Sequence, residues 1–330
     1  MPTAALDHPA QFRSVPRSDF GDVALSNGIS DICRIDGLTL GRCREPAGLF
    51  AELVESAASS ASVDARALRV RALLQLPRVA TFSGRVTRKQ IERELWHSAR
   101  LLRRDTAAAE SLVPQQRFGL QELKFAENFD PARASRVFSS LHYLRSARDG
   151  SEYFALLDPV QLRPVTICCV APLEWKKLGS TVRSQFGISP EHVRDVARVY
   201  SCTSAPPNAV SYLLARVRNV LARRNQDIDL LLTAVDPNLG FTGSSYRAAN
   251  WQWWLTVQPR PYLYLDRRYI TPRQLRQRFG TSSLDELRAS FPRHHFEQSR
   301  TRLLASLIFC CHVGRGPVAR LEMPGSPLHR

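Results

Sequence analysis

Residues 196–255 read VARVYSCTSAPPNAVSYLLARVRNVLARRNQDIDLLLTAVDPNLGFTGSSYRAANWQWWL, and the order of elements in this stretch decides the fold. The segment 196–202 is rich in β-branched and aromatic residues, which predicts a strand. Pro206 and Pro207 cannot continue that strand, because each proline lacks the backbone N–H that a sheet requires. Asn208 then occupies the position of a helix N-cap, where a side-chain oxygen accepts from the first free amides.

A helix follows this loop, and a buried strand follows the helix. Apolar residues recur at helical spacing over 210–221, which places them on one stripe. The segment 229–235 is a nearly continuous apolar run, typical of a strand buried in a partly parallel sheet. A short helix capped by Ser244 or Ser245 and a strand over 251–257 complete the unit. The sequence therefore predicts an α/β (α+β) fold in which helices flank a mixed sheet.

The loop between the first strand and the helix predicts an anion site. At such a corner, free backbone N–H groups and the helix dipole point at the ligand. Ser211 lies in the first turn of the predicted helix, and Arg198 on the preceding strand would add a charge-assisted contact. The alternative is that Ser211 only supports the first turn and that Arg198 is a solvated strand residue.

Three co-linear segments, RVY…APPNAVSYLL, TAVDPNLGFTG and YRAANW, resemble the Mom-type DNA adenine modification proteins of bacteriophages, within the GNAT acyltransferase fold. The resemblance covers residues 120–285. It implies a GNAT-like mixed sheet and a donor phosphate at the helix N-terminus, held by Arg198, Asn208 and Ser211. Ordinary GNAT enzymes have a glycine-containing phosphate loop, which residues 204–208 lack. The expected donor is therefore acyl-CoA or a related acyl donor, rather than acetyl-CoA in particular.

The same resemblance implies residues for proton transfer. Asp236 follows the buried strand at its carboxyl end, where ligand sites of such sheets collect; its alternative role is to cap an Asp-Pro turn. Tyr246 lies on the later short helix, where the family often has a general acid, and its alternative role is packing. His142 matches the early active-site segment of the family, although the residue pattern alone indicates a core or capping histidine. No metal site is predicted, because the chain has no C-x-x-C pair and His294-His295 has no acidic or cysteine partner at ligand spacing.

The charge of the chain predicts a polyanionic partner. The net charge is +16 and the isoelectric point is near 10.2, which favours nucleic acid first and an anionic membrane surface second. A basic helix predicted over 85–104 either contacts DNA phosphates or presents a solvated face. The densest basic patch of the second half predicts contacts with DNA phosphates. Its arginines are Arg267, Arg268, Arg273, Arg276 and Arg278.

The length of 330 residues predicts more than one domain. We expect an accessory region over 1–119, partly disordered at its start, a GNAT-like catalytic domain over 120–290, and a C-terminal helix and flexible tail over 291–330. The N-terminus has no apolar signal segment, and the apolar run 303–311 is too short to cross a bilayer. The seven cysteines are expected to be free thiols in a reducing cytoplasm.

Taken with the resemblance, these features predict a cytoplasmic transferase that acts on the N6 amine of adenine in double-stranded DNA. Two alternatives stay open. One is an acyl-CoA N-acyltransferase that acts on a protein or a small amine. The other is a non-catalytic DNA-binding protein on a degenerate GNAT scaffold. The sequence predicts neither the transferred group nor the oligomeric state.

Overall fold

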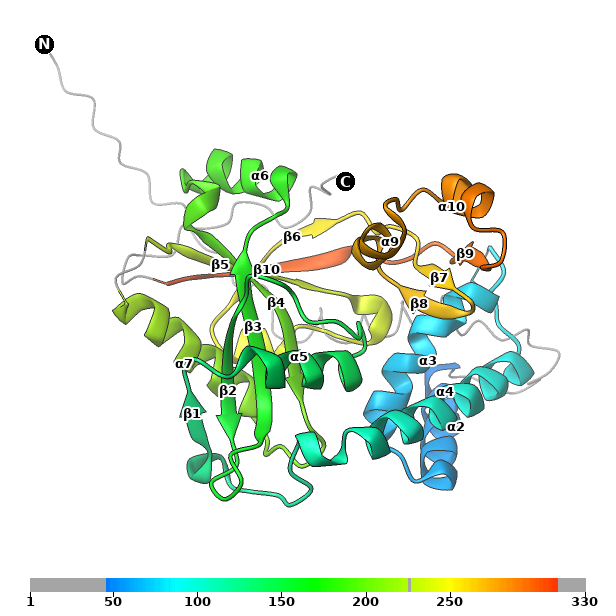
Figure 1. Cartoon of the computed structure of the whole chain (residues 1–330), viewed down its shortest axis with the longest axis horizontal. Coiled ribbons are helices and arrows are strands. Elements are labelled where there is room, and N and C mark those ends of the chain that lie inside the picture. The colour runs from blue at the N-terminus through cyan, green and yellow to red at the C-terminus, as the bar shows by residue number, and fades with distance from the viewer. Residues whose placement is uncertain (1–45, 83, 225–226, 314–330) are drawn as a thin grey trace, which may run out of the picture.

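A seven-stranded mixed sheet is the centre of the molecule. The computed structural model describes residues 46–82, 84–224 and 227–313. Within them, the main sheet has the order β1-β2-β3-β4-β5-β10-β6, and a small sheet has the order β8-β7-β9. Helices flank the main sheet, and the helical N-terminal region lies beside the small one (Figure 1). The predicted class, a mixed sheet flanked by helices with a mainly helical N-terminal region, is confirmed.

The strands and helices have the following bounds. The main sheet contains β1 (Lys124–Ala126), β2 (Glu152–Leu157), β3 (Pro164–Pro172), β4 (Val193–Ser201), β5 (Leu230–Val235), β6 (Gln252–Val257) and β10 (Ser306–His312). The small sheet contains β7 (Leu263–Leu265), β8 (Arg268–Ile270) and β9 (Phe296–Gln298). The α-helices are α2 (Pro46–Ala61), α3 (Ala65–Val79), α4 (Arg88–Ala108), α5 (Pro131–Ser140), α6 (Lys176–Phe186), α7 (Ala209–Arg223), α8 (Ser244–Ala248), α9 (Pro272–Phe279) and α10 (Leu284–Ser290). Four short 3₁₀ helices are η1 (Glu110–Leu112), η2 (Leu120–Glu122), η3 (Pro190–His192) and η4 (Pro237–Leu239).

The strands β4 and β5 run parallel and then separate. Their pairing begins at Val193 opposite Leu230 and ends at Asp195 opposite Leu232. Both strands continue beyond that point. The other strand pairs in the described residues are antiparallel. The sheet is therefore open between the carboxyl-terminal halves of β4 and β5.

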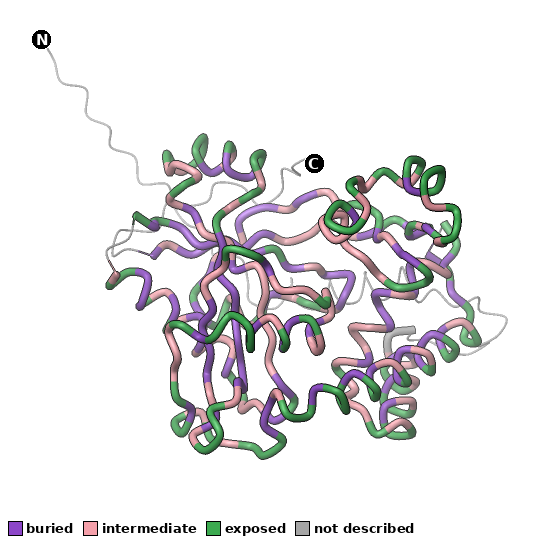
Figure 2. Tube along the Cα trace, viewed as in Figure 1, coloured by how far each residue is buried: buried purple, intermediate pink, exposed green. Residues whose placement is uncertain are grey.

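Helices cover both faces of this sheet. On one face, the apolar stripe predicted over 210–221 packs α7 against β4, β5 and β10, where Phe309 is fully buried. On the other face, α5 covers β2 and β3, and α6 covers β5, β10 and β6. Figure 2 shows the buried strands as the core between these helices. Each fully buried aliphatic side chain contributes roughly 1.5–3 kcal/mol to folding, so the stripe is a main source of stability.

The N-terminal helices pack on the small sheet and on the loop after β5. The helices α2, α3 and α4 share one core with Leu239, Tyr262 and Tyr264. The hydroxyl of Tyr264 donates to the carbonyl oxygen of Leu74 at 2.8 Å. Segments far apart in the sequence thus form one packed unit beside the open part of the main sheet.

The C-terminal part of the chain differs from the sequence prediction. Over 291–313, the described part of the segment expected to hold a C-terminal helix, the structure has β9 and β10, and β10 pairs with β5 and β6 inside the main sheet. The apolar run 303–311 supplies this strand, because both of its faces are covered by helices. The predicted disordered start and all but the first residues of the predicted tail lie outside the described residues. The described cysteines are free and buried, as predicted: Cys168, Cys169, Cys202, Cys310 and Cys311.

Candidate active site

The buried side chain of Thr233 bridges the opening between β4 and β5. Its hydroxyl lies 3.0 Å from the carbonyl oxygen of Val196 and 3.3 Å from the hydroxyl of Tyr246. A threonine hydroxyl carries one proton, so Thr233 donates to one of these oxygens at a time. The hydroxyl therefore links Tyr246 to the middle of the sheet.

Tyr246 lies on α8, the short helix expected at this place. The residue before the helix, Gly243, has a φ of 74°, and a Cβ added to it would lie 2.3 Å from the ring of Phe309. Only glycine fits there, so α8 can approach β10 closely. The Tyr246 ring packs on Trp251 and Phe309, with centroid distances of 5.3 and 5.9 Å. Burial raises the pKa of Tyr246, so its hydroxyl keeps its proton at neutral pH.

Asp236 follows β5, and three donors hold its carboxylate. The backbone N–H and the side-chain amide of Asn238 donate to Oδ1, at 3.0 and 2.7 Å. The hydroxyl of Tyr262 donates to Oδ2. Asp236 therefore also caps the turn that follows it, as the alternative prediction held, but the amide that it caps is that of Asn238 and not that of Leu239 or Gly240. These bonds keep the carboxylate in one orientation beside the open part of the sheet.

His142 and Tyr143 lie in the loop after α5. The Nδ1 atom of His142 lies 3.2 Å from the backbone N–H of Leu144, which donates to it. Burial, and then the positive charge of Arg198, lower the pKa of His142 well below its ordinary value. Burial and the negative charge of Asp236 raise the pKa of Tyr143 to about 12. His142 is therefore neutral, and the loop lies within electrostatic range of Arg198 and Asp236.

Arg198 lies on β4 opposite Cys169 of β3. Its Nη1 donates to the carbonyl oxygen of Ala197 at 2.6 Å. Its Nε is buried and has no hydrogen-bond partner among the residues that the structure describes. The charge of Arg198 acts on His142, so this partly exposed arginine lies near the loop of His142.

The N-terminus of α7 differs from its prediction in one respect. Asn208 is the N-cap residue, but its φ is 65° and its side chain makes no capping hydrogen bond. The left-handed backbone points the side chain away from the first amides, which leaves them without a side-chain cap. The Ser211 hydroxyl donates to the carbonyl oxygen of Asn208 at 3.0 Å. No described contact joins Asn208 or Ser211 to Arg198, so the three predicted donor ligands do not form one contact cluster.

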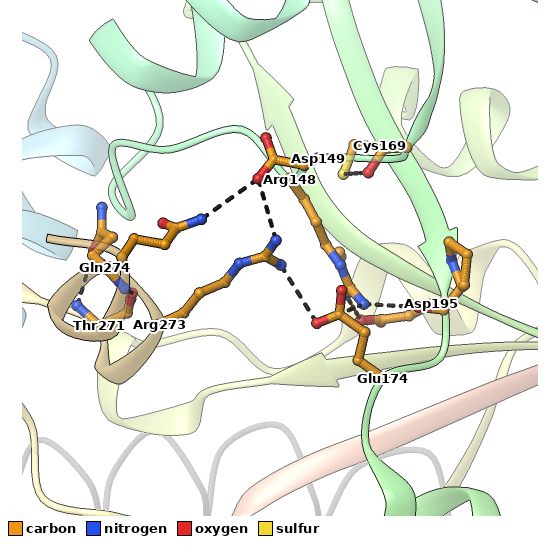
Figure 3. Close-up of polar contacts among 12 residues, drawn as sticks. Arg148, Asp149, Cys169, Glu174, Asp195, Thr271, Arg273 and Gln274 are labelled. Atoms are coloured by element: carbon orange, nitrogen blue, oxygen red, sulfur yellow. Dashed lines mark hydrogen bonds and ion pairs between the residues drawn. The ribbon is translucent and has the colours of Figure 1, made fainter. Parts of the chain in front are cut away.

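The predicted DNA-binding arginines lie on the small sheet and on α9. Arg267 and Arg268 are at the exposed turn between β7 and β8, and Arg276 and Arg278 are exposed on α9. Arg273 instead contacts two carboxylates, Asp149 at 3.4 Å and Glu174 at 3.5 Å (Figure 3). Four of the five arginines are thus available to a polyanion, while Arg273 is partly neutralised.

Sequence reasoning missed Thr233, Tyr143 and Tyr262. A signal existed for Thr233, which is the polar residue inside the apolar run 230–235, and a buried hydroxyl needs a partner. Tyr143 follows His142 directly. Tyr262 has no local signal, because its bond to Asp236 depends on tertiary packing across 26 positions.

A half-buried phenol, Tyr246, and an oriented carboxylate, Asp236, thus lie beside the opening between two parallel strands of a mixed sheet, and these are groups that can donate and accept protons. The model of the Mom protein family matches residues 125–310, which is more than half of the chain. The chain therefore belongs to the Mom protein family.

Other comparisons are less informative. A solved structure from Sphaerobacter thermophilus DSM 20745, a protein that carries an acetyltransferase description, is 8% identical and covers 63% of this chain and 88% of its own, with a TM-score of 0.23. A likeness of this size carries no information about activity. A search of curated proteins finds no significant match.

The described residues contain neither a membrane-spanning helix nor a cluster of metal ligands. No helix in that part of the chain is long and apolar enough to cross a bilayer. Likewise, over 46–82, 84–224 and 227–313, no three His, Cys, Asp or Glu side chains are grouped so as to hold a metal ion.

Proposed function

We propose that this chain is a transferase that modifies the exocyclic N6 amine of adenine in double-stranded DNA. The family match carries the proposal, because it spans every residue that the sequence predicts to act on the donor or on protons. These residues are His142, Arg198, Asn208, Ser211, Asp236 and Tyr246. His142, Arg198, Asp236 and Tyr246 also lie around the opening between β4 and β5, which supports a shared role.

The proposed chemistry needs one proton acceptor and one proton donor. An amine that attacks an acyl-type donor loses a proton, and the leaving group gains one. Asp236 is the acceptor, since its carboxylate is oriented by Tyr262 and Asn238. Tyr246 is the donor, since its raised pKa keeps its proton in place. Thr233 then donates to the phenolate that Tyr246 leaves behind, because its hydroxyl lies 3.3 Å away.

The donor is acyl-CoA or a related acyl donor in this proposal, and its phosphate would bind at the N-terminus of α7. Backbone N–H groups there carry no side-chain cap from Asn208, and helix N-termini attract anions. Arg198 supplies positive charge nearer to the reacting centre, beside His142. These residues would bind and orient the donor.

Nucleoside analysis tests this proposal. DNA from cells that express the chain is digested, and the nucleosides are weighed by mass spectrometry. We expect a modified adenine with the wild type, and a fall of about 10²- to 10⁴-fold with Tyr246→Phe, which removes only the hydroxyl. Asp236→Asn should behave similarly and lose about 1 kcal/mol of stability with the weakened turn cap.

The outcome separates this proposal from its alternatives. Unmodified DNA together with acylated protein or small amines would indicate an N-acyltransferase of another substrate class. Unmodified DNA together with tight DNA binding would indicate a non-catalytic protein. Modified adenine at wild-type levels in either variant, at equal abundance, would remove that residue from the mechanism.

A further inference from the structure

A cavity of about 240 Å³ lies beside the candidate active site, on the face of the sheet that α5 and α6 cover. Apolar and charged groups share its wall. The lining residues are Arg148, Leu173, Glu174, Trp175, Leu178, Asp195, Leu232, Thr233, Ala234 and Ile308. None of them except Thr233 has a role in the chemistry above.

The floor of the cavity is the point at which β4 and β5 separate. Asp195 and Leu232 are the last parallel pair, and Thr233 is the next residue along β5. The Thr233 hydroxyl lies 3.3 Å from the hydroxyl of Tyr246. A ligand on this floor is therefore one side chain away from the proposed proton donor.

The polar groups of the wall are fixed and incompletely paired. The Arg148 side chain is 9% exposed and contacts Asp195 at 2.5 Å and the carbonyl oxygen of Pro172 at 2.7 Å. Its Nε is buried and has no hydrogen-bond partner in the described part of the chain. The Nε of Arg148 is thus shut off from the cavity, whereas the carboxylate of Asp195, whose side chain is 25% exposed, is an acceptor between apolar side chains and the indole of Trp175. A carboxylate acceptor beside an aromatic surface suits a planar heterocycle that carries an exocyclic amine.

The size of the cavity selects a single base. Pockets for drug-sized ligands measure about 300–1,000 Å³, so this smaller cavity excludes a whole nucleotide. The sugar and phosphates would remain outside, next to the rim. There Arg273 of α9 contacts Glu174 at 3.5 Å and Asp149 at 3.4 Å (Figure 3). The basic helix α9 therefore borders the entrance.

We propose that this cavity receives an adenine base extruded from duplex DNA, with its ring beside Trp175 and its exocyclic amine toward the opening between β4 and β5, where Asp236 and Tyr246 act on it. The proposal rests on the proposed function and names where the substrate base binds. Extrusion costs a few kcal/mol and costs least for a mismatched base. The cavity therefore predicts a preference for duplexes in which the adenine is mismatched.

The test compares the affinity of the full chain for a matched duplex and for the same duplex with one A·C mismatch. We expect the wild type to prefer the mismatch about tenfold, because the base is easier to extrude. Ala234→Phe fills the cavity from an exposed position of β5, and Trp175→Ala removes the stacking surface. Both should lose the preference while binding the matched duplex as before. Val160→Phe, at a 75% exposed position of the β2–β3 loop, is the matched control and should keep it.

The outcomes separate the cavity from the function. A wild type without a mismatch preference, or an Ala234→Phe variant that keeps it, overturns the cavity assignment. If the wild type still modifies adenine in cells, only this assignment fails. If no adenine is modified and no duplex binds, the proposed function fails with it. The assignment of the cavity as the base-binding site is supported if Ala234→Phe and Trp175→Ala lose the mismatch preference, Val160→Phe keeps it, and all three variants unfold at the wild-type temperature.

A second inference concerns α4, which lies outside the residues matched by the family model. One face of this helix carries six exposed residues, Lys89, Arg93, Trp96, Arg100, Arg103 and Arg104. The first five recur every three or four residues, and Arg104 follows Arg103 directly. We call this face the α4 basic stripe. At about 1.5 Å per residue it is roughly 22 Å long, which is enough to contact several phosphates of a duplex.

The acids of α4 leave most of the α4 basic stripe without an ion-pair partner. Glu94 and Asp105 are buried on the opposite face, where they pair with Arg78 at 2.8 Å and Arg71 at 2.7 Å. The exposed acid, Glu92, pairs with Arg88 at 2.7 Å. Asp105 also lies 3.6 Å from Arg104. The other cations of the stripe, Lys89, Arg93, Arg100 and Arg103, have no ion-pair partner among the residues that the structure describes.

Trp96 is an exposed aromatic side chain within this charge. It is 63% exposed, and the guanidinium of Arg100 lies 5.0 Å from its ring centroid. The contact of Asp105 with Arg145 joins the helix to the loop that also carries His142. From the charge complementarity, we infer that the α4 basic stripe binds the backbone of the same duplex that the active site engages.

This inference rests on the proposed function, in which DNA is the substrate. The salt dependence of DNA binding tests it. The triple variant Arg93→Ala, Arg100→Ala, Arg103→Ala should reduce the slope of log K against log salt by about 2 to 3, at about 0.9 per phosphate contact. A control triple at exposed arginines elsewhere, Arg66→Ala, Arg117→Ala, Arg136→Ala, should change it by less than half as much. Equal changes in the two variants, or none, overturn the inference. If the wild type still modifies adenine when the two variants behave alike, the proposed function stands and only the assignment of the α4 basic stripe fails.

Discussion

The hydroxyl of Tyr262 donates a hydrogen bond to the carboxylate of Asp236. Tyr262 comes from the segment between β6 and β7, and its ring is buried in the core of the N-terminal helices. The carboxylate proposed to accept a proton is thus oriented from outside the main sheet. Packing of the N-terminal helices and orientation of the active site are therefore coupled.

Tyr262→Phe should lower activity without removing any group that touches the substrate. The ring stays in place, but Asp236 loses one of its donors and gains freedom to turn. Misplaced catalytic groups cost up to about 10²-fold in rate, and we expect a fall of about 10- to 100-fold in modified adenine. A hydrogen bond to a charged group contributes about 1.5–3 kcal/mol, so thermal unfolding should shift as well.

Tyr264→Phe is the matched control for that variant. It removes a hydroxyl from the same small sheet, one that donates to the carbonyl oxygen of Leu74 at 2.8 Å. It should lower stability by about 1 kcal/mol and leave activity per folded molecule unchanged. Equal activity losses in the two variants would show that Tyr262 acts only through stability.

His142 should make the fold weaker in mild acid. Burial, and then the charge of Arg198, hold its pKa well below 6.5 in the folded chain. Below pH 6.5 the unfolded chain binds a proton that the folded chain does not bind, so the free energy of unfolding falls as the pH falls. Urea unfolding should give a smaller free energy at about pH 5.5 than at about pH 7.5. His142→Gln should remove part of that difference.

His312 provides a comparison for this pH effect. Burial also lowers the pKa of His312, but that residue is only partly buried. His312→Gln should therefore remove a smaller share of the pH difference than His142→Gln. A pH difference that survives unchanged in His142→Gln would contradict the neutral buried state of this histidine.

The arginines of the small sheet and α9 should set much of the salt dependence of DNA binding. Alanine at Arg267, Arg268, Arg276 and Arg278 removes four exposed charges. Each lost phosphate contact should reduce the slope of log K against log salt by about 0.9. Alanine at four other exposed arginines, Arg117, Arg136, Arg183 and Arg216, is the control for net charge alone. The slopes are measured by filter binding at several salt concentrations. If the two variants have the same slope, this surface does not contact DNA phosphates.

The corner before α7 should bind the donor. Coenzyme A serves as the probe, and its binding is measured by calorimetry. Ser211→Ala removes a hydroxyl that contacts only the Asn208 carbonyl oxygen among the described residues, so stability should change little and donor affinity should fall. Arg198→Ala should weaken binding more, because it removes a charge. Normal affinity in both folded variants would make these residues structural.

The sequence by itself determined the local elements of this protein. The stripe over 210–221 predicted α7, and the apolar run before Asp236 predicted β5, because side-chain periodicity follows backbone geometry. The place of Tyr246 on a short helix followed from the same reading. The resemblance added the family, since long matching segments are specific even where the elements alone are not.

Only the tertiary structure decided how these elements meet. Three features depend on residues far apart in the chain. They are the position of β10 between β5 and β6, the hydrogen bond from Tyr262 to Asp236, and the contact of Thr233 with Tyr246 at the opening of the sheet. Asn208 also shows the limit of local reasoning, because its left-handed backbone turned a predicted capping side chain away from the helix. Such contacts depend on which surfaces pack together across the whole fold, and no window of neighbouring residues contains that information.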